Sequence, residues 1–289
     1  MEQIFLKACA KLNLFLDITG KCENGYHLIK SVMQSVDIFD RVSVKKSGEI
    51  SVKCSESALD GENNLAHKAA ALFFGQTGIA GGAEIYIEKH IPMQAGMAGG
   101  SADAAAVLYG LNRLYEAKLS AEELCAMGAR LGADLPFCLC GGTMLCEGIG
   151  ERLSPLPELS DCFFVIVKPE IGMSTAESYR IYDEHEAAGL EHGDFSAMST
   201  ALEAENIQNV GKALYNALEC TVPDSVLKIK SALLKVGADG ALMTGSGTAV
   251  FGIFQSIEKA AAARDALSAE YGSIFIARPA KSAVSEDES

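Results

Sequence analysis

The first third of the chain contains short stretches in which apolar and β-branched residues alternate with polar ones, a pattern typical of strands. The predicted strands of this part span residues 13–18, 32–39, 41–46 and 83–88. Apolar residues then recur at helical spacing, which predicts helices over residues 64–75, 101–115 and 120–131. Ser120 and Glu123 have the spacing of a capping box at the start of the third helix. The pattern therefore predicts a first half in which strands precede helices.

The second half mixes the two patterns. Residues 174–241 are predicted to be mostly helical, and another helix is predicted over residues 257–267. The predicted strands of this half span residues 143–146, 163–167, 241–244, 249–254 and 274–277. We expect an α+β fold of two lobes, residues 1–155 and 156–281, followed by an acidic, frayed tail over residues 282–289.

Composition removes several classes of protein. The chain has 289 residues, of which 49% are hydrophobic and 21% are charged, and this balance excludes a disordered chain. The net charge of −14 argues against a nucleic-acid partner that is bound by a basic face. Glycines and hydroxyl side chains interrupt the longest uncharged run, residues 240–257, which therefore predicts two buried strands rather than a membrane span. We expect neither a nucleic-acid nor a membrane partner.

The cysteines favour reduced thiols. There are nine, an odd number with irregular spacing, and residues 1–7 lack the charged and apolar segments of a signal peptide. A cytoplasmic location is therefore expected. Cys138, Cys140 and Cys146 lie close together, but no Cys-x-x-Cys pair accompanies them. Alternation along one buried strand explains these three cysteines, and no metal site is predicted.

Residues 92–106 read Pro-Met-Gln-Ala-Gly-Met-Ala-Gly-Gly-Ser-Ala-Asp-Ala-Ala-Ala, between a predicted strand and a predicted helix. Small residues let the backbone approach an anion, and the helix N-terminus offers free N–H groups, so this loop predicts a phosphate site. It lacks the Gly-Lys-Ser/Thr of a P-loop and the Gly-x-Gly-x-x-Gly spacing. The alternative is a tight turn with glycines for packing. Ser101 is expected to cap the helix or to contact a magnesium-bound phosphate, and Asp103 suits the first helical turn.

A second glycine-containing loop, residues 244–248, joins two predicted strands and reads Thr-Gly-Ser-Gly-Thr. By itself it is typical of an ordinary hairpin turn. Together with the first loop, it is a candidate to close over the same phosphates.

Three regions, taken in order, resemble the GHMP kinase family, which is named for its galacto-, homoserine, mevalonate and phosphomevalonate kinases. These regions are residues 11–16 with 24–27, residues 92–106 and residues 242–247. The resemblance runs from about Lys7 to Phe254. The family's loop usually reads Gly-Leu-Gly-Gly-Gly-Ser-Ser-Asp. Here Met97, Ala98 and Ala102 replace the leucine, one glycine and the second serine, so any role of that second hydroxyl is absent.

The resemblance implies a two-lobed kinase fold with ATP and substrate in the cleft between the lobes. It implies transfer of a phosphoryl group from ATP, delivered as its Mg²⁺ complex, to an alcohol. Residues 10–14, Gly25-Tyr26-His27 and residues 132–137 are similar to family members whose small-molecule substrate is linked to cytidine diphosphate. A monomer or a homodimer is expected. The alternatives are another small-molecule kinase of the family, of the homoserine or mevalonate type, and a non-catalytic nucleotide-binding protein.

The resemblance also assigns catalytic residues. Asp134, in the segment Gly-Ala-Asp-Leu-Pro-Phe, is implied to be the base that accepts the hydroxyl proton, and Lys11 is implied to lie beside it. The alternatives are that Asp134 caps a helix and that Lys11 is an edge-strand lysine facing solvent. Asn13 projects from the same face of the strand as Lys11 and is expected to bind the substrate or Asp134.

Binding residues follow from the same resemblance. Those assigned to the nucleotide are Asn64, Lys89, Pro92, Gly96, Met97, Ala98, Gly99, Gly100, Ser101, Ala102 and Asp103. Those assigned to the substrate are Asn13, Tyr26, His27, Thr175, Tyr179, Gly245 and Ser246. In this assignment His27 reads the edge of cytosine, while Tyr26 and Tyr179 stack on its two faces. For Lys89, a solvated strand end is the alternative.

Overall fold

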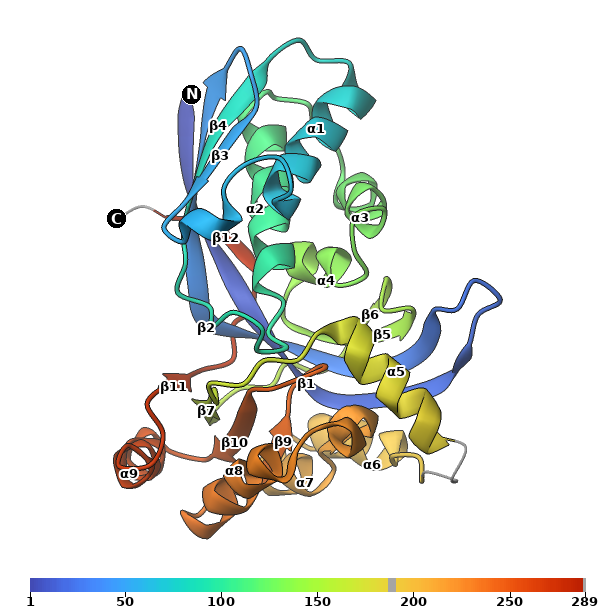
Figure 1. Ribbon diagram of the computed structural model, residues 1–289, viewed down its shortest axis with the longest axis vertical. Coiled ribbons are helices and arrows are strands. Elements are labelled where there is room, and N and C mark those ends of the chain that lie inside the picture. The colour runs from blue at the N-terminus through green and yellow to red at the C-terminus, as the bar shows by residue number, and fades with distance from the viewer. Residues whose placement is uncertain (187–190, 288–289) are drawn as a thin grey trace.

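The computed structural model describes residues 1–186 and 191–287, which form two lobes, each built on a sheet (Figure 1). The strands are β1 (Gln3–Lys21), β2 (His27–Ser47), β3 (Ser51–Cys54), β4 (Gly82–Glu88), β5 (Thr143–Gly148), β6 (Arg152–Pro155), β7 (Phe163–Val167), β8 (Tyr215–Asn216), β9 (Gly240–Met243), β10 (Val250–Phe254), β11 (Ile274–Ala277) and β12 (Val284–Glu286). The helices are α1 (Leu65–Thr77), α2 (Gly99–Leu114), α3 (Ala121–Ala129), α4 (Leu135–Cys140), α5 (Thr175–Glu186), α6 (Phe195–Glu203), α7 (Ile207–Lys212), α8 (Asp224–Lys235) and α9 (Ile257–Leu267), with 3₁₀ turns η1 (Ser57–Leu59) and η2 (Ala217–Thr221). The predicted α+β class is confirmed.

The first sheet has the strand order β12-β1-β2-β4-β3, and β5 with β6 extends it from β2. The antiparallel pair β1–β2 runs from Gln3 opposite Lys45 to Lys21 opposite His27. The two strands predicted at 32–39 and 41–46 are therefore one strand, β2. Between Cys9 and Ala10 the register shifts, because a bulge in β2 takes up the extra residues without ending the strand.

Helix α2 packs directly on β1 and β2 and begins at the glycine-rich loop (Figure 1). Its alanines at 104–106 are fully buried. A Cβ atom on Gly110 would lie 2.9 Å from the Leu6 side chain, so a glycine is needed for this close approach. Small residues thus let the middle and the C-terminal half of α2 lie close against the strands.

The second sheet has the order β11-β7-β10-β9, and all its pairs are antiparallel. Strands β9 and β10 confirm the prediction that residues 240–257 form two strands joined by a turn. In Figure 1 this sheet and helices α5 to α9 make the lower lobe, while α1 to α4 and most of the first sheet make the upper one, and the far ends of β1 and β2 run into the lower half of the view.

The chain passes from the first sheet to the second between β6 and β7, near the predicted boundary at residue 155. Two later strands return to the first sheet, because β8 pairs in parallel with β1, and β12 pairs antiparallel with it. Two strands from the second half of the chain thus complete the first sheet, and the boundary stays a prediction.

The prediction of a frayed tail is wrong for most of it. Strand β12 pairs with residues 6–8 of β1, and Asp287 forms ion pairs with Lys7 (3.2 Å) and Arg41 (3.1 Å). An open strand edge and two basic partners therefore order this acidic segment. Residues 288–289 of the predicted tail lie outside the described residues.

The prediction for the three neighbouring cysteines is also partly wrong. Cys138 and Cys140 belong to the short helix α4, and Cys146 alone belongs to a strand, β5. A helix begins there because Pro136 lies in its first turn, where a missing N–H costs nothing.

Among the described residues, no helix combines the length and the apolar character that crossing a bilayer requires.

Candidate active site

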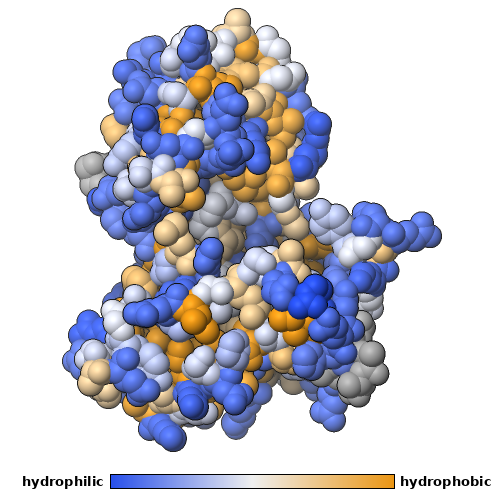
Figure 2. All heavy atoms as spheres, viewed as in Figure 1, coloured by the Kyte–Doolittle hydropathy of each residue, from blue (hydrophilic) through white to orange (hydrophobic). Residues whose placement is uncertain are grey.

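A cleft of about 1490 Å³ lies between the two lobes, and Figure 2 shows the surface hollowed there. Ligand sites typically measure roughly 300–1,000 Å³, so this cleft has room for two substrates. Apart from Ala102, which is buried inside α2, every predicted site residue lines it. The assignment of Ala102 to the nucleotide is therefore corrected, and the other predicted residues are brought together.

The glycine-rich loop ends where α2 begins. Ala98 precedes the helix with a left-handed backbone (φ 59°) and offers no side-chain cap. The first intrahelical bond of the turn is donated by the Ala102 N–H to the Ala98 carbonyl, which leaves the preceding N–H groups for an anion. The expectation that Ser101 caps the helix is wrong, because Ser101 lies within the first turn. The loop has the geometry of a phosphate site.

The second glycine loop lies against the first. A Cβ on Gly96 (φ 73°) would lie 2.1 Å from the Thr244 carbonyl oxygen, so only glycine fits there. The Ala249 N–H donates to the Ala95 carbonyl at 3.3 Å. Asn216, which the sequence gave no reason to single out, donates to the carbonyls of Met243 and Gly245 and fixes the second loop.

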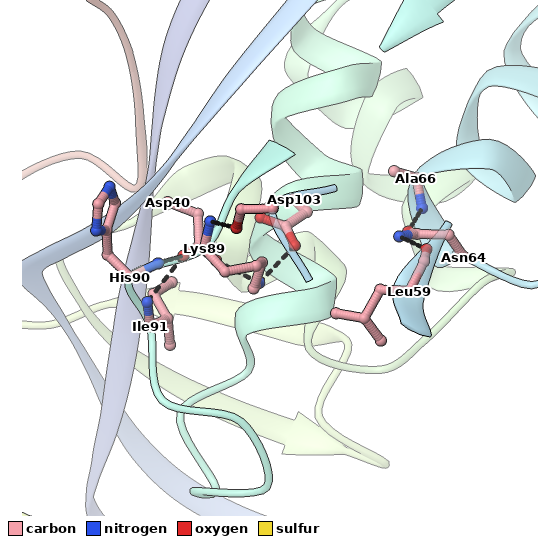
Figure 3. Close-up of polar contacts among 9 residues, drawn as sticks. Asp40, Leu59, Asn64, Ala66, Lys89, His90, Ile91 and Asp103 are labelled. Atoms are coloured by element: carbon pink, nitrogen blue, oxygen red, sulfur yellow. Dashed lines mark hydrogen bonds and ion pairs between the residues drawn. The ribbon is translucent and has the colours of Figure 1, made fainter. Parts of the chain in front are cut away.

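Lys89 is held between two carboxylates, as Figure 3 shows. Its Nζ donates to Asp40 and, at 2.6 Å, to Oδ2 of Asp103, and only 6% of its side chain is exposed. Asp40 also accepts from the backbone N–H groups of His90 and Ile91. Although burial acts to lower the pKa of Lys89, Asp103 and Asp40 raise it. Lys89 thus positions the glycine-rich loop through its two carboxyl partners, and its contact with ATP stays a prediction.

Asp103 is almost completely buried at the start of α2. Its Oδ1 has no hydrogen-bond partner among the described residues. Burial and the neighbouring Asp40 raise the pKa of Asp103 to about 8, against the opposing effect of Lys89. The cluster of Asp40, Lys89 and Asp103 therefore favours a proton on this carboxyl group.

Asn64 also has a structural role. It is the N-cap of α1, where its Oδ1 accepts from the Ala66 N–H at 2.9 Å and its Nδ2 donates to the Leu59 carbonyl at 2.8 Å (Figure 3). Both ends of the amide are therefore occupied by the protein. Asn64 shapes the wall of the cleft, and the contact of its side chain with ATP stays a prediction.

Lys11 lies on β1 and is buried, which rules out the edge-strand alternative. Burial lowers the pKa of Lys11, while the nearby carboxylate of Asp134 acts to raise it. Its Nζ donates to Asn13 Oδ1, and Asn13 in turn donates to Ser31 Oγ at 2.8 Å. A Cβ on Gly245 would lie 2.9 Å from this Nζ, so the second loop also meets Lys11.

Among the described residues Asn13 makes no hydrogen bond to Asp134, and its binding of the substrate stays a prediction. Its side chain orients Lys11, and its backbone N–H donates to Thr244 Oγ1 at 3.0 Å. Asn13 thereby connects the buried lysine to the second glycine loop.

Asp134 is the residue immediately before α4. It occupies the N-cap position, as the alternative held, but its side chain makes no capping bond. The carboxylate lines the cleft, and no described residue donates a hydrogen bond to it. A carboxylate left without protein donors in a substrate-sized cleft is suited to accept a proton from a ligand.

His27 lies at the far end of the cleft, at the first residue of β2. Its Nε2 is 2.5 Å from Asp183 Oδ1, and its ring stacks on Tyr179 with 4.7 Å between the ring centroids. Tyr26, next to it, is 61% exposed. We expected Tyr26 and Tyr179 to flank a bound base, but Tyr179 contacts the His27 ring itself.

Asp183 was missed in the sequence, although it lies one helical turn after Tyr179 in α5. It also accepts from Lys21 Nζ at 2.6 Å, and this bond, followed by that from His27, holds the pKa of Asp183 below its usual value. The spacing of four residues from Tyr179 is the signal that places it on the same helix face.

The start of α5 contacts the second loop. Thr175 and Ser246 place their hydroxyl oxygens 3.1 Å apart. This contact joins two elements of the lower lobe, and both residues line the cleft.

Within the part of the chain that the structure describes, no group of three or more His, Cys, Asp or Glu side chains is arranged to hold a metal ion.

Comparisons with known proteins agree with this geometry. Residues 64–142 match the GHMP kinases N terminal domain, and residues 198–273 match the GHMP kinases C terminal domain. The chain is 41% identical to the 4-diphosphocytidyl-2-C-methyl-D-erythritol kinase of Clostridium botulinum (strain Eklund 17B / Type B), over 94% of this chain and 99% of that one. It is 44% identical to the enzyme of the same name from Carboxydothermus hydrogenoformans, over 94% and 95%.

A solved structure is similar over the same length. The crystal structure of a 4-(cytidine 5'-diphospho)-2C-methyl-D-erythritol kinase superposes with a TM-score of 0.79 at 31% identity, covering 95% of this chain and 98% of that one. Matches on both family domains and whole-length identity above 40% lead to one conclusion: the chain belongs to the GHMP kinase family and has its two-lobed fold.

Proposed function

We propose that this chain transfers the γ-phosphoryl group of ATP to the 2-hydroxyl of 4-diphosphocytidyl-2-C-methyl-D-erythritol, giving the 2-phosphate and ADP. The observation that carries the proposal is whole-length identity of about 40% to relatives named for kinase action on this substrate. The cleft supports it, because the phosphate loop, Asp134 and His27 line one continuous volume. The reaction belongs to the non-mevalonate isoprenoid pathway.

Phosphoryl transfer requires mainly positioning and charge stabilisation. The N–H groups at the start of α2 hold the phosphates, and the second glycine loop closes over them. Asp134 orients the acceptor hydroxyl and takes its proton as the new bond forms. Lys11 offsets the negative charge that Asp134 and the phosphates bring together, and its burial strengthens that effect.

The opposite end of the cleft holds the cytidine. His27 reads the edge of the base, and the exposed ring of Tyr26 is free to stack on its face. Asp183 holds the His27 ring through its Nε2 atom, and Tyr179 stacks on the face of the same ring. A neutral base that is recognised by aromatic and imidazole groups suits a protein of net charge −14.

Magnesium is proposed to arrive with the nucleotide. The residues fit such an ion, because the Ser101 hydroxyl and the partnerless Oδ1 of Asp103 are oxygen donors in the first two turns of α2, and the ion would displace the proton that the cluster otherwise favours on Asp103. The ion would neutralise charge on the β- and γ-phosphates. The protein ligands would then be Ser101 and Asp103.

The remaining proposals concern context. We expect the protein to act in the cytoplasm on a small molecule as a monomer or a homodimer, without a nucleic-acid or membrane partner.

The test is release of ADP by the purified protein with magnesium-ATP and three alcohols in parallel: the cytidyl substrate, mevalonate and homoserine. Turnover with the cytidyl substrate alone is expected. Turnover with mevalonate or homoserine instead would support another kinase of the family. Binding of ATP without turnover of any of the three would contradict the proposed reaction.

A further inference from the structure

Two cysteines lie in contact outside the cleft. Cys125 belongs to α3 and Cys140 is the last residue of α4, and their Sγ atoms are 3.6 Å apart. Both are partly exposed, and all nine cysteines are free thiols. Figure 1 shows α3 and α4 side by side on the helical face of the upper lobe.

These thiols differ from the rest. Cys9, Cys54, Cys138, Cys146 and Cys162 are buried. Burial raises the pKa of Cys9 to about 11 and that of Cys162 to about 12, which keeps them protonated and unreactive. The hydrogen bond between Cys125 and Cys140 instead lowers the pKa of Cys140 to about 7 and raises the pKa of Cys125. Among the cysteines with a shifted pKa, Cys140 is the one whose shift favours the thiolate.

We propose that Cys125 and Cys140 form a reversible disulfide when the protein meets a peroxide. A disulfide has an S–S length of about 2.05 Å, so the two sulfur atoms have to approach by only about 1.5 Å. The pair is therefore an oxidation site that lies apart from the phosphate and cytidine ends of the cleft.

The reaction with hydrogen peroxide balances in two steps. The Cys140 thiolate attacks one peroxide oxygen, an S–O bond forms, the O–O bond breaks, and the hydroxide that leaves becomes water by taking a proton from solvent. The Cys125 sulfur then attacks the Cys140 sulfenic acid. An S–S bond forms, the S–O bond breaks, and the leaving hydroxide takes the Cys125 proton to give a second water. Two thiols are oxidised and one peroxide is reduced.

Helix α4 connects this site to the cleft, because Asp134 immediately precedes it and Cys140 ends it. The packing of α3 on α4 is tight, since a Cβ on Gly128 would lie 3.1 Å from the Leu135 Cβ. Drawing Cys140 toward α3 therefore shifts the short helix and its N-terminal Asp134. A displacement of about 1 Å in a catalytic group can cost up to about 10²-fold, so turnover should fall by about tenfold. This second part rests on the proposed function.

The experiment treats the reduced full-length protein with hydrogen peroxide and counts free thiols after unfolding. Peptide mass mapping then locates any disulfide, and ADP release is followed before and after addition of dithiothreitol. The variants are Cys125→Ser and Cys140→Ser. The matched control is Cys220→Ser, because Cys220 is also partly exposed but its thiol donates to the Ala217 carbonyl rather than to another described cysteine.

We expect two fewer thiols in the wild type and in Cys220→Ser, a 125–140 disulfide, and turnover that dithiothreitol restores. Neither Cys125→Ser nor Cys140→Ser should form this disulfide. A different disulfide, or unchanged thiols, would overturn the proposal whatever the protein's activity. A 125–140 disulfide with unchanged turnover would overturn the coupling to Asp134.

Discussion

The Nζ atom of Lys89 donates a hydrogen bond of 2.6 Å to Oδ2 of Asp103, and this bond joins the residue after β4 to the start of α2 across the glycine-rich loop. Asp40, which belongs to β2, also accepts a hydrogen bond from Lys89 Nζ. The loop is therefore clamped at both of its ends, and its N–H groups are arranged before a nucleotide arrives.

Lys89→Met should lower the free energy of unfolding by about 3–5 kcal/mol, because it leaves two buried carboxyl groups without their cation. Urea unfolding measures this loss. Lys45→Met is the matched control, since Lys45 pairs with Glu84 at the exposed surface and its removal should cost at most about 1 kcal/mol. Equal losses in the two variants would contradict the clamp.

Asp103 should make stability fall as pH rises. The folded protein keeps the Asp103 proton up to about pH 8, whereas the unfolded chain releases it near pH 4. Between these values the folded state binds more protons, so the contribution of this group to the free energy of unfolding decreases with pH. Compared with Asp103→Asn, the wild type should lose stability between about pH 5 and about pH 8. A pH-independent difference between the two proteins would show that Asp103 is ionised throughout.

Gly96→Ala should separate the two glycine loops. The new Cβ would meet the Thr244 carbonyl oxygen at 2.1 Å, and the backbone there has a positive φ. We expect a loss of at least about 1–3 kcal/mol in urea unfolding and weaker ATP binding in a titration. In Gly100→Ala the new Cβ meets nothing within 4 Å, and stability should hold or rise by up to about 1 kcal/mol. If Gly96→Ala were as stable as Gly100→Ala, the loops would not be in contact.

His27→Ala should raise the KM for the cytidyl substrate by about tenfold or more and leave the KM for ATP unchanged, since it removes a hydrogen-bonding group from one end of the cleft. Asp183→Ala should also raise the KM for the cytidyl substrate, but by less, because it removes the hydrogen bond that orients the His27 ring. Steady-state kinetics with each substrate varied separately measures both constants. His185→Ala, on the same helix but exposed, is the control. Equal changes in the two constants would contradict the placement of the cytidine.

The sequence predicted which residues line the cleft more accurately than it predicted the contacts that these residues make. Spacing and resemblance identified Lys89 and Asn64 as cleft residues, but Lys89 pairs with Asp40, which is 49 residues away in the sequence. Such a pairing depends on strand order, and local patterns carry no information about it. Asn64 was read as a ligand, although its position before a helix already favours a cap.

The same limit explains the C-terminal error. An acidic segment next to the terminus is typical of a frayed end when it is read alone. It becomes a strand because β1 offers a free edge and because Lys7 and Arg41 neutralise Asp287. Strands with strong local patterns, such as β7 and β11, were predicted with the correct bounds.

The most direct test of the account measures transfer of the γ-phosphoryl group from ATP to the cytidyl substrate by the wild type and by Asp134→Asn. Glu170→Gln serves as control, because Glu170 is an exposed carboxylate that lines the same cleft. We predict that Asp134→Asn loses about 10²–10⁴ in turnover while its ATP affinity is unchanged, and that Glu170→Gln remains active. Transfer by Asp134→Asn at nearly the wild-type rate would contradict the central claim that this carboxylate receives the proton of the acceptor hydroxyl.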